Sequence, residues 1–216
     1  MINVLAVGND RCIKELEDKL GDSVQLRTTY ELSEVTDLSK FDVIFDFEIA
    51  DNPENYLEYK ELKGTIVLLN TVKITLSELA FTFGNGSADL YGFNGLPSFI
   101  NREVLEVSAL TEEVSENFNK LNWDYQLVDD RVGLVTPRIV LMIINEAFYT
   151  VQEGTATKED IDLGMKLGTN YPYGPFEWLN LIGIEEVYET LEAIYEDTKE
   201  ERYKIAPFLK KEYLKS

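Results

Sequence analysis

The chain has 216 residues, of which 44% are hydrophobic and 12% aromatic, and its 40 acidic against 20 basic residues give a formal net charge of −20. This charge argues against nucleic acid or an anionic membrane as a partner. Because the chain has no histidine, it cannot contain a Ser-His-Asp or Cys-His catalytic arrangement, an HExxH zinc site or an imidazole base. Without a bilayer-length apolar run or a signal peptide, and with Cys12 as its one cysteine, the sequence predicts a soluble cytoplasmic protein without a metal site.

Short β-like runs alternate with helical patterns between residue 1 and about residue 110. The strands are expected at residues 2–7, 25–27, 41–47, 65–70, 89–93 and 104–107, and the helices at 12–20 and 77–81. This alternation is typical of βαβ units and a largely parallel sheet. Residues 111–122 then predict a helix that starts from a Thr111 cap, and residues 125–130 predict a last strand.

After Asp130 the pattern predicts helices and no further strand. They are expected at residues 138–154, at 157–168 with a Thr157 cap and a terminal Gly168, from Pro175 onward, and at 184–198. The boundary between an α/β domain, residues 1–130, and a helical domain, residues 131–216, is therefore expected near residues 129–137.

Residues 145–187 carry several short motifs in a fixed order. These are Asn145-Glu146-Ala147, Glu159-Asp160-Ile161-Asp162, Met165-Lys166-Leu167-Gly168, Tyr171-Pro172, Gly174-Pro175-Phe176-Glu177 and Leu181-Ile182-Gly183. In order and spacing they resemble the C-terminal domain of the 3-hydroxyacyl-CoA dehydrogenase family. More faintly, residues 41–47, 70–80 and 90–97 resemble the family's strand ending in Glu-Ala-Val, its Asn-Thr-Ser segment and its His-Phe-Phe-Asn-Pro segment.

The resemblance implies a reduced Rossmann-like α/β domain followed by a helical domain of the family's C-terminal type. The span between the first strand and residues 41–47 is shorter than in the family, which removes part of the second βα unit and its contribution to cofactor and CoA binding. The resemblance also implies a homodimer formed through the helical domain.

An enzyme of this family would transfer hydride between NAD and C3 of a 3-hydroxyacyl-CoA, using a His paired with a Glu and assisted by a Ser and an Asn. Here the His position falls on Tyr91, the Ser position on Val72 and the Asn position on Pro137. The ordinary pKa of a phenol, near 10, is too high for the role of the imidazole, and neither Val nor Pro has a side-chain donor. The Glu position falls on Glu106 by its flanking residues and on Glu103 by counting without gaps; we prefer Glu106, whose apolar neighbours suit an inward-facing strand position.

The turn after the first strand begins like the GxGxxG sequence of dinucleotide-binding folds. Gly8 takes the first glycine position, but Asp10 and Ile13 take the second and third. A side chain at these positions blocks the approach of the backbone to a pyrophosphate, and Asp10 adds a carboxylate where the phosphate charge would lie. The turn therefore predicts a vestigial site, with no cofactor bound.

Two interpretations follow. In the first, the chain is a catalytically inactive member of the family that acts as a binding, regulatory or structural homologue, with acyl-CoA or an active paralogue as a partner. The replacement of the glycine turn, the His, the Ser and the Asn favours it. The alternative is an NAD-dependent oxidoreductase that acts on 3-hydroxyacyl-CoA in fatty-acid metabolism through an atypical site.

Overall fold

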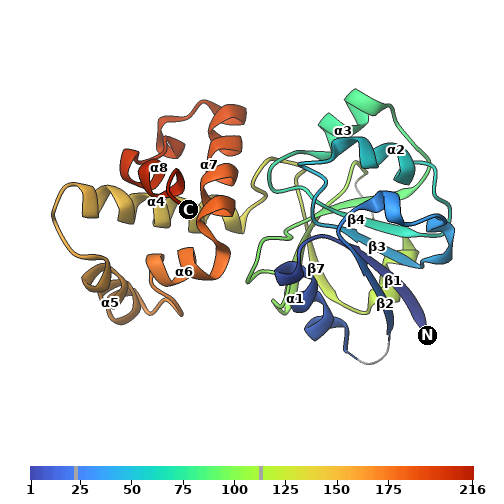
Figure 1. The fold of residues 1–216 in the computed structure, drawn as a ribbon, viewed down its shortest axis with the longest axis horizontal. Coiled ribbons are helices and arrows are strands. Elements are labelled where there is room, and N and C mark those ends of the chain that lie inside the picture. The colour runs from blue at the N-terminus through green and yellow to red at the C-terminus, as the bar shows by residue number, and fades with distance from the viewer. Residues whose placement is uncertain (22–23, 112–113) are drawn as a thin grey trace. The chain divides into compact units, whose positions relative to one another are not determined.

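A computed structural model describes residues 1–21, 24–111 and 114–216 of the chain. These residues form two compact units, an α/β unit at Met1–Leu134 and a helical unit at Val135–Ser216 (Figure 1).

The α/β unit is built on one seven-stranded sheet with the order β2-β1-β3-β4-β5-β6-β7. Every neighbouring pair is parallel except β5 and β6, which are antiparallel. The central strands read as continuous apolar runs because a parallel sheet is covered on both faces. The strands are β1 Ile2–Val7, β2 Val24–Thr29, β3 Val43–Asp46, β4 Ile66–Asn70, β5 Asp89–Phe93, β6 Val104–Ser108 and β7 Asp124–Val128.

Two apolar clusters cover the two faces of the sheet. One contains Phe45, Tyr91 and Phe93 and packs against α1 (Asp10–Leu20) and the 3₁₀-helix η5 (Glu116–Leu121). The other packs against shorter elements, among which α2 and α3 lie on the opposite side of the sheet from α1 (Figure 1). These elements are η2 Leu32–Glu34, η3 Leu38–Lys40, η4 Pro53–Asn55, α2 Tyr56–Tyr59 and α3 Leu76–Phe83.

The expected fold class is confirmed, whereas one predicted element is wrong. Residues 116–121 of the predicted helix at 111–122 form the 3₁₀-helix η5, and residues 112–113 lie outside the described residues. The connection between β2 and β3, residues 30–42, contains only η2 and η3. The helix and strand of a full second βα unit are therefore missing from this connection.

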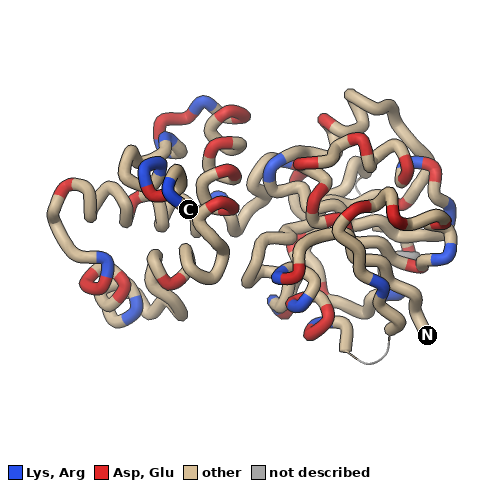
Figure 2. The backbone as a smooth tube through the Cα atoms, in the orientation of Figure 1, with Lys and Arg blue, Asp and Glu red and all other residues tan. Residues whose placement is uncertain are grey.

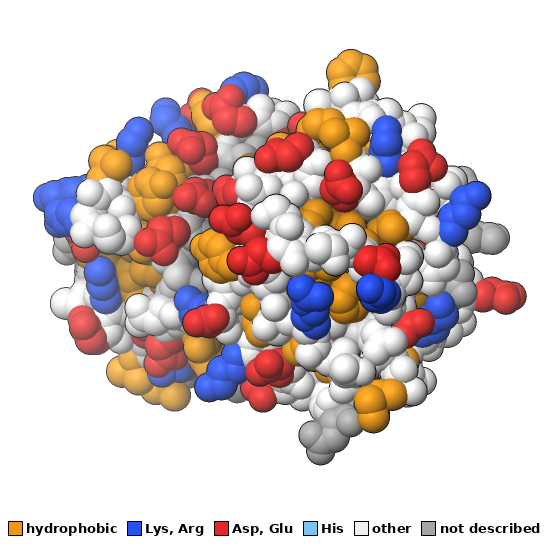
Figure 3. All heavy atoms as spheres, turned by 45° about the vertical axis from the view of Figure 1, so that its right-hand side comes forward, with side chains coloured by type: hydrophobic (Ala, Val, Ile, Leu, Met, Phe, Trp, Pro, Cys, Tyr) orange, Lys and Arg blue, Asp and Glu red, His pale blue; other side chains and the backbone are white. Residues whose placement is uncertain are grey.

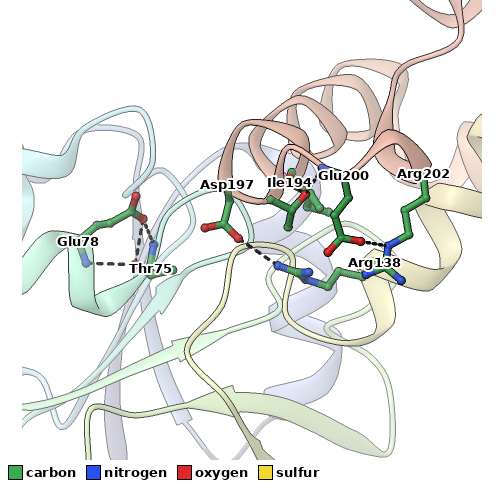
Figure 4. A network of polar contacts seen from close by, with 8 residues as sticks. Thr75, Glu78, Arg138, Ile194, Asp197, Glu200 and Arg202 are labelled. Atoms are coloured by element: carbon green, nitrogen blue, oxygen red, sulfur yellow. Dashed lines mark hydrogen bonds and ion pairs between the residues drawn. The ribbon is translucent and has the colours of Figure 1, made fainter.

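The helical unit contains five α-helices and one 3₁₀-helix within its fully described range. They are α4 Thr136–Gln152, α5 Lys158–Thr169, α6 Pro175–Ile182, α7 Ile184–Thr198, η6 Glu201–Tyr203 and α8 Pro207–Tyr213. Acidic residues recur along α7 (Figure 2), and the Arg138 guanidinium of α4 donates to the Asp197 carboxylate of α7 at 3.4 Å (Figure 4). Among the described residues, no helix combines the length and apolar character needed to cross a bilayer.

The residues that carry the family resemblance hold the helical unit together. The buried Asn145 amide of α4 donates to the Lys204 carbonyl at 2.9 Å and accepts from the Ala206 N–H at 2.8 Å, which joins the chain before α8 to α4. At the start of α6, Asp162 of α5 accepts from the Phe176 N–H at 2.8 Å, and Glu177 accepts from the Gly174 N–H at 2.9 Å. These motif residues thus fix where α6 begins and how α5 and α8 attach.

Candidate functional site

The sheet order predicts a crevice at the carboxyl ends of β1 and β3. From β1 the chain runs to β2 on one side and then crosses to β3 on the other, so that β1 and β3 flank the point where the strand order reverses. Open α/β sheets bind their ligands at such a point. Gly8 follows β1 and Phe47 follows β3, so these two residues and their neighbours form the candidate site.

The two strand ends are in direct contact across this crevice. A Cβ on Gly8 would lie 2.9 Å from the Cβ of Phe47 and 3.1 Å from its Cδ2. Phe47 is buried, its ring centroid lies 5.4 Å from that of Phe93, and its carbonyl accepts from the Asn70 amide at 3.3 Å. The aromatic side chain therefore fills the space beside the turn, and Gly8 is required for its close approach.

The N-terminus of α1 is capped by the chain itself. The Asn9 side-chain oxygen accepts from the N–H groups of Arg11 and Cys12, each at 3.2 Å, and the Asn9 carbonyl accepts from the Ile13 N–H at 3.1 Å. The N–H groups of Arg11 and Cys12 are among those that a helix N-terminus offers to a phosphate, whereas the bond from Ile13 is the first hydrogen bond of the helix itself. Asp10 is exposed in the first turn, where its carboxylate complements the helix dipole.

Further carboxylates surround the crevice. Asn9 donates to the Glu48 carboxylate at 3.3 Å, and a cavity of about 510 Å³ beside β2 and β3 is lined by Glu31, Glu48, Asp51 and Glu54 among others. The fully buried Asp46 accepts from the Glu48 N–H, the Asn55 amide and the Tyr59 hydroxyl at 2.8, 3.2 and 2.8 Å. Burial raises the pKa of the Asp46 carboxyl above its usual range, and these hydrogen bonds oppose that shift.

The structure separates the other positions that the resemblance singled out in the α/β unit. Tyr91 is buried in the middle of β5, pairs in register with Leu68, and accepts from the Ser115 N–H at 2.9 Å. Val72 lies two residues beyond the end of β4 and accepts from a backbone N–H through its carbonyl. Tyr91 therefore lies within the sheet, whereas Val72 lies beyond the carboxyl end of its strand.

The two glutamate candidates lie in and beside β6. Leu105 and Val107 face the same core cluster as Tyr91, so the half-buried Glu106 between them projects from the opposite face of the sheet. Glu103 is exposed and precedes the strand. Glu106 and Tyr91 therefore lie on opposite faces of the sheet.

In the helical unit, Pro137 is buried in the first turn of α4, where a residue without an N–H is tolerated. Nowhere in the described ranges do three His, Cys, Asp or Glu side chains gather to hold a metal ion.

Three residues of the crevice were missed by the sequence analysis. Asn9 had a usable signal, because Asn directly before a helical pattern is a preferred N-cap. Phe47 and Glu48 had none, since only the pairing of β1 with β3 brings them beside the turn.

Comparison with known proteins identifies the family. The profile of the 3-hydroxyacyl-CoA dehydrogenase C-terminal domain matches residues 133–215. A 3-hydroxybutyryl-CoA dehydrogenase of Bradyrhizobium diazoefficiens is 35% identical over 202 residues, which cover 85% of this chain and 68% of that protein. One of Clostridioides difficile is 28% identical over 219 residues, which cover 95% of this chain and 75% of that protein.

A solved structure supports the same fold. The crystal structure of M. tuberculosis FadB2 superposes with a TM-score of 0.76 at 17% identity, over 98% of this chain and 93% of that chain. By sequence, the chain belongs to the 3-hydroxyacyl-CoA dehydrogenase family.

Proposed function

We propose that this family member does not carry out hydride transfer and acts instead as a binding, regulatory or structural homologue. The observation that carries the proposal is the closed turn at the crevice, where Phe47 fills the space beside Gly8 and Asn9 occupies N–H groups of α1. These residues do not fit the pyrophosphate of a dinucleotide in its usual place.

Charge supports the same conclusion. Asp10 and Glu48 lie at the turn, and acidic side chains recur over the face of the protein seen in Figure 3. A carboxylate close to a phosphate costs about 1 kcal/mol where it is exposed, as Asp10 is, and on the order of a few kcal/mol where it is half-buried, as Glu48 is; 1.4 kcal/mol already changes affinity tenfold. Micromolar affinity for NAD is therefore not expected.

The test is a titration of NADH followed by an assay of NADH oxidation with acetoacetyl-CoA. We expect neither saturable binding at micromolar NADH nor turnover, with an active 3-hydroxybutyryl-CoA dehydrogenase as the positive control. Saturable binding together with turnover would overturn the proposal. Acyl-CoA is titrated separately, because retained acyl-CoA affinity without turnover is the result that a binding role predicts.

The alternative function, an NAD-dependent oxidoreductase of 3-hydroxyacyl-CoA with an atypical site, is favoured by one observation. Glu31 follows β2 and lines the cavity beside β2 and β3, near the position at which dinucleotide folds place an acidic residue for the ribose hydroxyls. If Glu31 binds the ribose of a dinucleotide, Glu31→Gln should weaken NADH binding. If the protein is inactive as proposed, neither the wild type nor Glu31→Gln should bind NADH.

We further propose a homodimer through the helical unit. A groove between α4 and η6 is lined by Ile139, Met142, Ile143 and Tyr149 together with Glu146, Glu153, Arg202 and Lys204, and Ile139 is 52% exposed. A surface with apolar side chains and both signs of charge can be complementary to itself, as a two-fold interface requires.

The dimer is tested by a charge swap measured with light scattering. One variant changes Arg202 and Lys204 to Glu, and the other changes Glu146 and Glu153 to Lys. Each alone should be monomeric because like charges then face each other, whereas a mixture should form heterodimers. A dimer that persists in both variants would place the interface elsewhere.

A further inference from the structure

Residues 94–102, which form most of the connection between β5 and β6, run along one face of α1 and are called the strap below. Three α1 side chains, spaced to share that face, contact it: the Cys12 thiol lies 3.9 Å from the Gly95 carbonyl, Glu15 accepts from Ser98, and Lys19 donates to the Arg102 carbonyl. The strap is thereby attached to α1 along its whole length.

The middle contact between the strap and α1 is a hydrogen bond from the Ser98 N–H to the Glu15 carboxylate. Both oxygens of Glu15 accept from the Ser98 N–H, at 2.8 and 2.9 Å, so the carboxylate is centred on this donor. Hydrogen bonds to an ionised group are about twice as strong as neutral ones. Arg102 donates from its Nε to the Ser98 carbonyl at 3.1 Å, so both backbone groups of Ser98 are held.

Ser98 is also the strained residue of the strap. Its φ is +75°, in the left-handed region that L side chains rarely adopt, and its buried hydroxyl has no hydrogen-bond partner. Each feature has a cost, and such a residue persists only where its surroundings hold it. The contacts with α1 therefore hold the backbone around Ser98, while Leu96, Phe99 and Ile100 of the strap are buried in the protein.

We propose that the strap opens as a unit, that the Glu15 carboxylate is the catch that holds it closed, and that opening controls access to the Cys12 thiol beneath it. Cys12 is 4% exposed in the closed form, and it is the one cysteine of the chain. Its reaction with a thiol reagent in native buffer therefore reports strap opening directly.

The experiment measures the rate of thiol labelling of the full chain in four proteins. Glu15→Gln weakens the catch and should speed labelling roughly ten- to a hundredfold. Glu17→Gln, an exposed glutamate of the same helix, is the matched control and should leave the rate unchanged. Ser98→Gly relieves the left-handed strain in the closed form and should slow labelling by about two- to fivefold.

Three results would overturn the proposal. Glu15→Gln could label no faster than Glu17→Gln, which would mean that the carboxylate is not the catch. Ser98→Gly could label faster than the wild type, as an unstrained loop made more flexible would. The labelling rate could also follow global stability measured by urea unfolding across the variants, which would mean that Cys12 reacts only in the unfolded chain.

Discussion

The close contact between Gly8 and Phe47 predicts that a larger residue at position 8 destabilises the protein. A methyl group on Gly8 would lie 2.9 Å from the Phe47 Cβ, closer than any ordinary carbon–carbon contact, and Gly8 itself is outside the left-handed region of backbone conformation. Gly8→Ala should therefore destabilise the protein by overpacking, by about 1–3 kcal/mol, and not by backbone strain.

The cause can be isolated by repeating Gly8→Ala in two other backgrounds. Phe47→Ala removes the ring but keeps the Cβ, so only part of the Gly8→Ala penalty should disappear. Phe47→Gly removes the Cβ as well, and there the penalty should fall close to zero, a coupling energy of about 1–3 kcal/mol. Phe47→Ala alone should cost roughly 3–5 kcal/mol, because a buried aromatic ring is lost.

The assay is urea unfolding followed by circular dichroism at 10–25 °C, chosen because these losses are a large part of a typical domain stability of about 5–15 kcal/mol. Equal Gly8→Ala penalties in all three backgrounds would refute the reasoning. The glycine would then be needed for a reason other than Phe47, and the closed crevice would lose its main support.

Three further predictions use the same unfolding measurement. Burial raises the pKa of Asp46 in the folded state above its unfolded value, so the contribution of Asp46 to stability is greatest at low pH and is lost as the pH rises through the folded pKa. The free energy of unfolding of the wild type, measured relative to that of Asp46→Asn, should therefore fall from pH 4 to pH 7. A difference that grows with pH would contradict this. Tyr59→Phe removes a hydrogen bond to the buried Asp46 carboxylate and should cost about 1.5–3 kcal/mol, whereas no measurable loss would mean that Asp46 is protonated or finds another donor. Asn145→Ala leaves the Lys204 carbonyl and the Ala206 N–H without their partner and should cost about 2–4 kcal/mol, and a loss below 1 kcal/mol would show that the chain before α8 is held by packing alone.

Elements with strong local signals could be predicted from the sequence. The apolar run of β1 and the amphipathic pattern of α7 match their predicted ranges, residues 2–7 and 184–198, and Pro175 begins α6 as its missing N–H favours. The segment before β7 could not be predicted, because its helix-like composition competes with packing of the buried Phe118 and Leu121 against the sheet, which a 3₁₀-helix allows.

At the crevice, prediction from the sequence is limited by contacts between strands that are distant in the chain. The departures from the glycine pattern at Asp10 and Ile13 are visible in the sequence, whereas the obstruction by Phe47 depends on a strand paired 39 residues away. For the same reason the sequence placed Tyr91 by its family position but did not show that its hydroxyl faces Ser115. Local patterns predict elements well, and contacts between elements that are distant in the chain require the fold.

The split between the two units also bears on how strong family resemblance and the proposed loss of the site can coexist in one chain. The motifs that identify the family include Asn145, Asp162, Gly174 and Glu177, and each of these has a packing or capping role that the helical unit needs whatever chemistry the protein performs. Their presence is therefore evidence for the fold and is neutral about catalysis. The crevice is the informative part, because a turn that binds a pyrophosphate has to stay open, whereas a turn without that ligand is free to gain stability by closing on a side chain such as Phe47.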